Sequence, residues 1–311
     1  MLAKAPKTPP ANLRALNERV QATLLAGVVG GLRCLPPVAA SNLGGWLARS
    51  IGPWLPVSRI ADNNLRPALP ELDAAARARV IRGVWDNLGR TAAELPHLAS
   101  FRRTDAGPGW EIEGAANLAH LQASGGQALF FSGHFGNWEL ILPIAAALGL
   151  NVSGFYRAAS NVAANDLIQS LRQGALGPDV SMFPKGAQGA RSALLHLHRG
   201  GSLGLLLDQK MNDGIPVSFF GRDAMTAPAL AQFALRFNVP IMPVHVLRLG
   251  PARFRMVCDQ PLVVARTGDR TTDLHAITLA VNQTLERWIR ADPSSWLWLH
   301  RRWPKPLSAS V

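Results

Sequence analysis

The alternation of short apolar runs with helical patterns constrains the fold of this chain more than any other feature. From residue 128 onward, short apolar segments typical of buried strands alternate with longer segments in which apolar residues recur at helical spacing. The predicted strands are 128–132, 152–156, 180–183, 203–207, 241–247 and 253–257. The predicted helices are 138–148, 163–173, 187–199, 227–237 and 271–291. This order predicts an α/β fold with a mixed, largely parallel central sheet flanked by helices.

The first third of the chain has a different pattern. Residues 74–95 place apolar side chains at helical spacing, and Pro96 then interrupts that spacing. A Gly- and Pro-containing segment, 105–110, reads as a loop. We therefore predict an N-terminal helical region over residues 1–104 and an α/β core over residues 105–311.

Residues 20–32 form a thirteen-residue apolar stretch, shorter than the roughly 20 residues that cross a bilayer. Three interpretations remain open. The stretch is a shallow amphipathic membrane anchor, a buried helix, or the hydrophobic part of a signal peptide with residues 38–40 as the cleavage site. The flanking basic residues favour the anchor and place it at anionic headgroups on the cytoplasmic side.

Composition narrows the class of partner. The net charge is +12, hydrophobic residues make up 48% of the chain and charged residues 17%, so anionic partners and an apolar surface are both expected. Zinc-finger spacing and RNP-type aromatic motifs are absent, so we predict no nucleic-acid partner. Cys34 and Cys258 are too far apart for a disulfide framework, and we expect both to be buried in a reducing compartment.

The segment 131–140, Phe-Ser-Gly-His-Phe-Gly-Asn-Trp-Glu-Leu, carries the first chemical signal. On a continuous helix His134 and Glu139 would lie about 140° apart, so the two meet only if His134 sits on a turn and Glu139 in the first helical turn. Small residues around His134 allow other groups to approach closely. The spacing differs from the i, i+4 histidines of the zinc motif HExxH, so we predict an acid–base dyad and no metal.

Other polar residues also follow predicted strands: Arg157, Lys185 and Asp208. In a parallel sheet such loops converge on one edge, where sites form. Arg157 either stabilises an oxyanion or binds phosphate, or is a surface residue paired with Asp166. Asp208 either orients His134 or binds a substrate hydroxyl, or forms a helix cap or turn.

Two aromatic segments allow different interpretations. Residues 217–226 contain Phe219-Phe220-Gly221-Arg222, which either lines an acyl pocket, dips into lipid or forms a core hairpin. Residues 296–305 interleave tryptophans with cations, a composition found both in membrane-interface anchors and in nucleic-acid binding. We favour the membrane interface for the second segment because no RNA motif accompanies it.

Several stretches in order carry a family resemblance. They are Asn87-Leu88-Gly89-Arg90 with Glu94, the 133–139 motif, Tyr156-Arg157 with Asn161 and Arg172, Gly200-Gly201 with Asp208-Gln209, Phe219-Phe220-Gly221 with Thr226, and Trp298-His300-Arg301-Arg302-Trp303. In these stretches the chain resembles the bacterial lipid A biosynthesis acyltransferases, the lauroyl and myristoyl transferases of the H-x4-D/E glycerolipid acyltransferase group. The resemblance runs from about residue 20 to the C-terminus.

The resemblance implies roles for individual residues. His134 would be the general base and Glu139 its partner. The implied substrate-binding residues are Arg157, Asn161, Arg172, Asp208, Gln209 and Thr226. No metal and no bound cofactor is implied.

The resemblance also implies an activity. The expected enzyme lies at the cytoplasmic face of the inner membrane and transfers an acyl chain from an acyl carrier protein thioester to a hydroxyl of a lipid A precursor, in lipopolysaccharide biosynthesis. The acceptor would be an anionic glycolipid, and the membrane surface a second partner. The alternatives are an acyltransferase for another glycolipid or aminolipid, and a non-catalytic lipid- or nucleic-acid-binding protein.

Overall fold

A computed structural model describes residues 11–303 except 124–125, 159–160 and 179. Within these residues a seven-stranded sheet has the order β1-β9-β8-β2-β5-β3-β4, and a separate hairpin pairs β6 with β7. The strands are β1 Gly109–Glu113, β2 Leu129–Ser132, β3 Val152–Tyr156, β4 Met182–Pro184, β5 Ser202–Leu206, β6 Ile215–Phe219, β7 Arg222–Thr226, β8 Ile241–Gly250 and β9 Arg253–Cys258. The α/β prediction is confirmed.

The sheet is mixed, and its central part is parallel. Strand β2 runs parallel to both of its neighbours, β5 and β8, and β3 runs parallel to β4 and β5. Only β8 and β9 pair antiparallel within the described sheet, and β1 pairs with β9 in parallel. Consequently the loops that follow β2, β5 and β3 leave from the same edge of the sheet.

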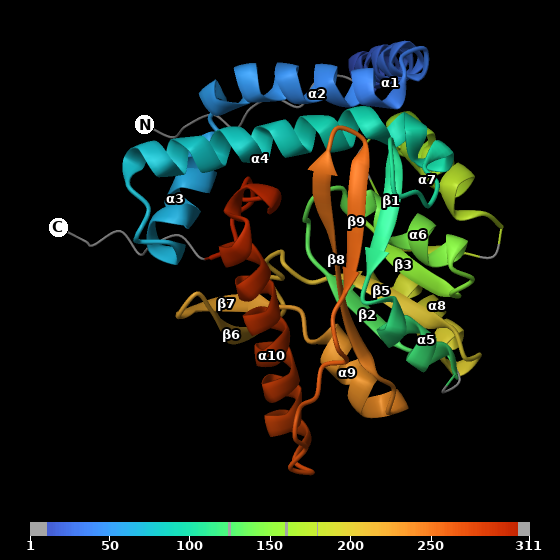
Figure 1. The fold of residues 1–311 in the computed structure, drawn as a ribbon, viewed down its shortest axis with the longest axis vertical. Helices are drawn as coiled ribbons and strands as arrows, with labels where there is room; N and C mark the ends of the chain where they lie inside the picture. Colours follow the sequence, from blue (N-terminus) through green and yellow to red (C-terminus); the bar gives the residue numbers. More distant parts are fainter. Residues whose placement is uncertain (1–10, 124–125, 159–160, 179, 304–311) are drawn as a thin grey trace.

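Helices cover the sheet and extend beyond one end of it (Figure 1). The helices of the N-terminal region are α1 Ala11–Arg33, α2 Pro37–Ile51, α3 Ser58–Ala68 and α4 Ala74–Glu94, followed by the short helix η2 Leu95–Ser100. The remaining helices are α5 Ala115–Ala123, α6 Ile141–Ala147, α7 Val162–Leu176, α8 Ala187–His198, α9 Ala229–Phe237 and α10 Arg270–Ala291. In Figure 1 the long helices α2 and α4 lie side by side across one end of the molecule.

All six predicted strands and all five predicted helices of the core are present, with shifted ends. Strand β4 begins at Met182 rather than at residue 180, and helix 138–148 divides into the turn Trp138–Leu140 and α6. The sequence did not predict β1, whose first residues fall in the segment assigned to a loop. Its two glutamates weaken a strand signal; Glu111 pairs with Arg253 and Arg255 of β9, and Glu113 pairs with Arg255.

The predicted N-terminal region and core share one hydrophobic interior. Leu65 of α3 and Val84 of α4 belong to the same buried cluster as Leu129 and Phe131 of β2. The proposed boundary near residue 104 therefore does not separate two cores.

The interpretation of the C-terminal segment as a membrane-interface anchor is wrong for its described part, residues 296–303. Trp296 and Trp298 are fully buried, and Trp303 is 5% exposed. The indole N–H of Trp298 donates to the Pro293 carbonyl and that of Trp303 to the Phe219 carbonyl. These hydrogen bonds remove the need for water at the polar edge of each ring, so the rings are stable inside the protein.

Two other expectations concern exposure. Phe219 and Phe220 are buried, so of the three interpretations for that segment the structure supports the core hairpin, β6–β7. Cys34 is exposed, which corrects the expectation that both cysteines are buried, because α1 ends at Arg33 on the surface; Cys258 is buried.

Apolar residues 20–32 lie within α1, and much of this stretch is at the surface. Val20, Leu24 and Val28, spaced four residues apart and therefore on one side of the helix, are 48%, 65% and 59% exposed. This exposure contradicts the interpretation of the stretch as a buried helix. In the described part of the chain, no helix combines the length and the apolarity needed to cross a bilayer.

Candidate active site

His134 lies on the turn that follows the central strand β2, as predicted. Strand β2 is buried along its whole length, and Gly133 then lets the chain turn next to Asp208. Glu139 follows in the first short helical turn, Trp138–Leu140, also as predicted. The local fold therefore agrees with the geometry that the motif spacing required.

The partner of the His134 ring is Asp208 and not Glu139. Asp208 follows β5, the parallel neighbour of β2, so the two loops meet at one edge of the sheet. One carboxylate oxygen, Oδ1, lies 2.8 Å from Nδ1 of His134, and Oδ2 accepts the backbone N–H of His134 at 3.0 Å. The indole N–H of Trp296 donates to Oδ2 at 2.7 Å. This arrangement fixes both the position and the orientation of a fully buried carboxylate.

Burial and the charge of the partner shift the pKa values of His134 and Asp208 in opposite directions. Burial alone raises the pKa of the Asp208 carboxyl, but the His134 ring and the hydrogen bonds outweigh it and hold that pKa well below its usual range. Burial alone lowers the pKa of His134, but the charge and hydrogen bond of Asp208 outweigh it and raise that pKa above its ordinary value. Asp208 is therefore ionised at neutral pH, and its carboxylate stabilises the protonated imidazole.

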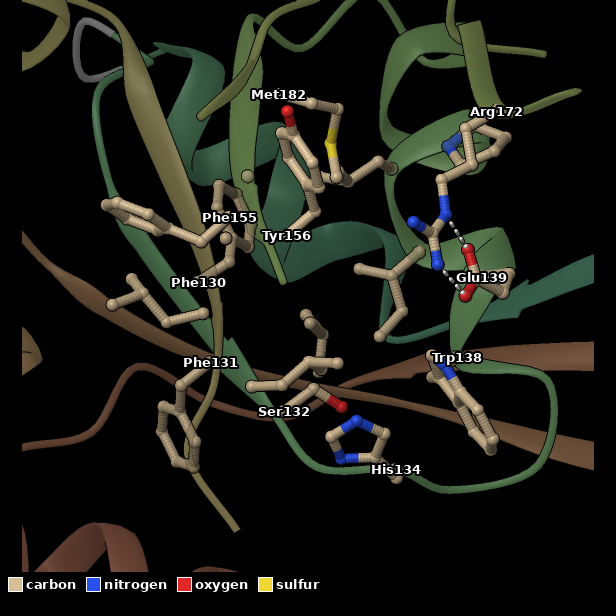
Figure 2. Close-up of a pocket in the computed structure, with 18 of the residues that line it drawn as sticks. Phe130, Phe131, Ser132, His134, Trp138, Glu139, Phe155, Tyr156, Arg172 and Met182 are labelled. Carbon is tan, nitrogen blue, oxygen red and sulfur yellow. Dashed lines mark hydrogen bonds and ion pairs between the residues drawn. The ribbon is translucent and has the colours of Figure 1, made fainter. Parts of the chain in front are cut away.

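Glu139 pairs with Arg172 of α7. The Arg172 guanidinium donates two hydrogen bonds to the Glu139 carboxylate, at 2.7 and 2.6 Å. The expected contact between Glu139 and the His134 ring is wrong, because this two-point pairing holds the carboxylate against α7. Figure 2 shows the Glu139–Arg172 pair and the His134 ring as separate groups that border one cavity.

The loop that carries His134 is held from behind by α4. Asn87 and Thr91 of α4 both donate to the backbone carbonyl of Gly136, at 2.9 and 3.0 Å. Asn137 donates to the buried carboxylate of Glu94, which Arg248 of β8 neutralises. The N-terminal helices thus contribute directly to the position of the site.

The loop that carries His134 requires a glycine at position 136. It has a positive φ of 51°, and a side-chain carbon at this position would lie 2.2 Å from the Val246 carbonyl oxygen. A residue with a side chain would therefore displace the loop.

A cavity of about 430 Å³ opens beside His134. Its polar lining residues include His134, Ser132, Glu139, Arg157, Arg172 and Gln209. The rest of its wall is mainly apolar and comes from β2, β3, β5, α6 and the end of α7. Its size is that of a site for one drug-sized ligand.

Two glycines form part of the cavity wall. Gly154 of β3 and Gly204 of β5 are neighbours in the sheet register. Because neither has a side chain, Leu142 of α6 packs directly over them; an added carbon would lie 2.7 Å from Leu142 at position 154 and 3.3 Å at position 204. Leu142 and the two glycines together close one side of the cavity.

The other polar residues at strand ends differ in placement. Arg157, which follows β3, and Gln209 both line the cavity. Arg157 makes no ion pair with any residue in the described ranges, which excludes the predicted pairing with Asp166 as its role in this structure. The Gln209 side-chain nitrogen lies 3.5 Å from Nε2 of His134. Lys185 is exposed and does not line this cavity.

Two residues expected to bind substrate are placed elsewhere. Asn161 caps α7 by accepting the N–H of Ala164 and donates to the Glu18 carbonyl of α1, so it ties two helices together. Thr226 is fully buried and accepts a hydrogen bond from Arg302. Neither residue lines the cavity, and both side chains make hydrogen bonds within the protein.

Two further residues contribute to the site without a sequence signal for their role. Trp296, which holds Asp208, stood in a segment interpreted as a membrane anchor. Glu94 appeared among the residues of the resemblance, but without a role. The only sign of such residues is that they are buried in the folded protein. Trp296 and Asp208 are 88 positions apart in the chain, so no local sequence pattern indicates their contact.

The arrangement is suited to proton transfer at a hydroxyl next to an apolar chain. Hydrogen bonding of Nδ1 to Asp208 leaves Nε2 as the ring atom available to accept a proton. Among the residues that the structure describes, no cluster of three or more His, Cys, Asp or Glu side chains has the geometry to hold a metal ion.

The comparison with known families agrees with this chemistry. The model of the bacterial lipid A biosynthesis acyltransferases matches residues 11–305, nearly the whole chain. A search of curated proteins found no match. The resemblance drawn from the motifs is confirmed: the chain belongs to the bacterial lipid A biosynthesis acyltransferase family and is an acyltransferase.

Proposed function

We propose that the protein transfers a fatty acyl chain from an acyl carrier protein thioester to a hydroxyl of a lipid A precursor. The observation that carries this proposal is the His134–Asp208 pair, whose ring lines a cavity with a largely apolar wall. The imidazole is a general base, and the cavity suits a hydrocarbon chain.

In the proposed reaction, Nε2 of His134 accepts the proton of the acceptor hydroxyl as its oxygen attacks the thioester carbonyl. Asp208 stabilises the imidazolium that forms and holds the ring in the tautomer that leaves Nε2 free. The carbon–sulfur bond then breaks, the thiolate leaves, and the proton passes from Nε2 to the thiolate. A base placed in this way contributes roughly 10²- to 10⁴-fold to the rate.

The leaving group requires little help from the protein. A thiol has a pKa of about 8.5, so its thiolate is a good leaving group near neutral pH. Arg157, exposed at the cavity and without an ion-pair partner in the described part of the chain, is suited to bind the developing oxyanion or a phosphate. Glu139 and Arg172 form a fixed ion pair that shapes the cavity near His134.

The acyl chain of the donor would lie along the apolar wall, with its end near Leu142, Gly154 and Gly204. The net charge of +12 favours both an acidic carrier protein and an anionic glycolipid acceptor. An acceptor that is another glycolipid or aminolipid would fit the same charge.

We further propose that the protein works at the cytoplasmic face of the inner membrane and contacts it through α1, α2 and the turn after α2. These elements expose a set of large apolar residues, here named the N-terminal apolar face. Its members are Val20, Leu24, Val28, Leu43, Trp46, Leu47, Ile51, Trp54 and Leu55. Positions 43, 47 and 51 lie on one side of α2, and Trp46 and Trp54 are 54% and 86% exposed. Exposed tryptophans beside basic residues favour a bilayer interface.

The activity is tested with the purified full chain, radiolabelled acyl carrier protein thioester and a lipid A precursor. The expected result is a labelled product heavier by one acyl chain. Transfer to a different glycolipid or aminolipid but not to the lipid A precursor would refute the acceptor. If no acyl carrier protein thioester supports transfer, the proposed donor is refuted.

The membrane proposal is tested by flotation with vesicles that contain anionic phospholipid. The variant Trp46→Asp/Trp54→Asp should reduce the bound fraction by about tenfold or more, because two large side chains lose their burial in the bilayer. Val263, 91% exposed on another part of the molecule, supplies the control Val263→Asp, which should bind like the wild type. Equal binding of all three proteins would contradict the proposed surface.

A further inference from the structure

A second cavity adjoins the first. Its volume is about 570 Å³, and it lies between η2, α6 and the C-terminal end of α7. Leu98, Pro143 and Leu176 line both cavities. These three apolar side chains therefore form a common wall, and a ligand in the second cavity would lie next to a ligand in the first.

The second cavity combines apolar walls with two cations. Phe101, Trp110 and Leu148 contribute apolar surface, and the exposed Arg102 and Arg103 contribute positive charge. No carboxylate lines this cavity, and neither arginine has a carboxylate partner in the described ranges. The Arg102 guanidinium donates to the backbone carbonyls of Ala99 and Phe101, which restrict its position. Such a site suits a hydrocarbon chain that carries an anionic group.

The position of the cavity relates it to the N-terminal apolar face. Helix η2, which supplies Leu98 and borders the cavity, packs against α1, and the His97 ring bonds to the Leu32 carbonyl at 3.0 Å. A lipid at α1 would therefore be close to the second cavity.

An acyl transfer between two lipid-like substrates needs room for more than one chain. The first cavity, at about 430 Å³, has the volume of a site for one ligand. We propose that the second cavity binds a hydrocarbon chain of the acceptor lipid, and that Arg102 and Arg103 bind the acceptor's anionic group. This proposal rests on the proposed function, because it assumes that the acceptor is a lipid.

Gly174 of α7 offers a variant that fills this cavity without disturbing the fold. It lines the cavity, has ordinary helical geometry, and an added side-chain carbon would have no atom within 4 Å. Replacing an exposed helix glycine also favours the helix by up to about 1 kcal/mol. Gly174→Phe adds a large side chain to the lining of the cavity, whereas Gly174→Ala adds one methyl group and serves as the size control.

Steady-state kinetics with a lipid A precursor and an acyl carrier protein thioester distinguish the two substrates. Gly174→Phe should raise the KM for the acceptor by about tenfold, since it displaces roughly two methylene groups, and should leave the KM for the donor unchanged. Arg103→Glu should also raise the acceptor KM, whereas Arg199→Glu, at an exposed site outside both cavities, should not. An unchanged acceptor KM in Gly174→Phe overturns the proposal. An increase in the donor KM alone assigns the cavity to the donor chain and also overturns it.

A second measurement does not depend on catalysis. Wild-type protein is photolabelled with phosphatidic acid that carries a diazirine on one acyl chain, and labelled peptides are identified by mass spectrometry. Labels are expected on residues 98–103, 143–148 and 174–177, and Gly174→Phe should reduce them at least tenfold. Absence of labelling there, or equal labelling by a diacylglycerol with the same diazirine chain, overturns the proposal even if transfer to a lipid A precursor is observed. Selective labelling in a protein without transferase activity supports the site and refutes the proposed function instead.

Discussion

Two hydrogen-bonded side-chain pairs lie at the cavity, and each contains one residue of the His134 motif. In the first, His134 contacts Asp208, which is fully buried and held by the Trp296 N–H and the His134 backbone. In the second, Glu139 contacts Arg172, and both side chains retain some exposure, 15% and 22%. The first pair contains an imidazole, a group that can exist with or without its extra proton, whereas an arginine stays charged. The two pairs therefore have different chemical capacities: the ring of the first can exchange a proton, whereas the second keeps a fixed arrangement of opposite charges.

The two pairs also show that the spacing of residues in a short motif does not determine which side chains contact each other. His134 and Glu139 are five positions apart but do not form the predicted pair. Their partners lie 74 and 33 positions away in the chain, on β5's loop and on α7. The spacing in the motif determines the backbone positions of the two residues. The tertiary structure determines which side chain each of them contacts.

The largest effect is expected from His134→Ala. Loss of the general base should lower kcat by roughly 10²- to 10⁴-fold, with a smaller change in KM, because the hydroxyl proton then has no acceptor. The measurement is acyl transfer by the purified variant, with circular dichroism as the control for folding. Wild-type kcat in a folded variant would remove His134 from the mechanism.

The next largest effect is expected from Asp208→Asn, which keeps the shape of the side chain and removes its charge. We expect kcat to fall by about 10²-fold or more, because the imidazolium loses its stabilising carboxylate and the ring loses its fixed tautomer. Glu139→Gln is the matched comparison, since it also converts a carboxylate into an amide. A larger loss in Glu139→Gln than in Asp208→Asn would reverse the roles assigned to the two pairs.

Removing the Glu139–Arg172 pair should have an intermediate effect. Glu139→Gln and Arg172→Gln should each lower kcat/KM by about tenfold, and the double variant should be no worse than the poorer single variant. The reason is that each single change leaves one partly buried charge without its partner. The double-mutant cycle measures this coupling. Fully additive losses would mean that the two residues act independently of each other.

The smallest effect is expected from Trp296→Phe, which removes the hydrogen bond to Asp208 but retains most of the ring. We expect kcat to fall by about threefold with KM unchanged, because Asp208 is less firmly oriented. Trp298→Phe removes an indole N–H that contacts a backbone carbonyl away from the site, and it is the control for loss of packing. Equal kcat in the two variants would reduce Trp296 to a structural role.

Much of the fold could be predicted from local sequence patterns. The central strands are buried on both faces and read as continuous apolar runs, and the helices around them show regular apolar spacing. Strand β1 was missed because it is an edge strand of the sheet and its glutamates find their partners on β9. Local patterns do not record such a partner.

Less of the site could be predicted, for a similar reason. The strand-end rule brought His134, Arg157 and Asp208 to one edge, and the structure agrees. It could not assign partners, and it could not exclude Asn161 and Thr226, whose hydrogen bonds to α1 and Arg302 are long-range. Composition also misled at the C-terminus: tryptophans mixed with cations occur both in the exposed N-terminal apolar face and in the buried segment 296–303.

We propose that Asp208, and not Glu139, is the partner of the His134 imidazole during the reaction. The most direct test is the pKa of His134, measured by NMR titration of histidine-labelled protein in the wild type, Asp208→Asn and Glu139→Gln. Burial alone lowers this pKa, and Asp208 raises it by more than Glu139 does. The wild-type value should therefore lie above the ordinary value of about 6.5. It should fall well below that value in Asp208→Asn and fall less in Glu139→Gln. A larger fall in Glu139→Gln than in Asp208→Asn would contradict the account.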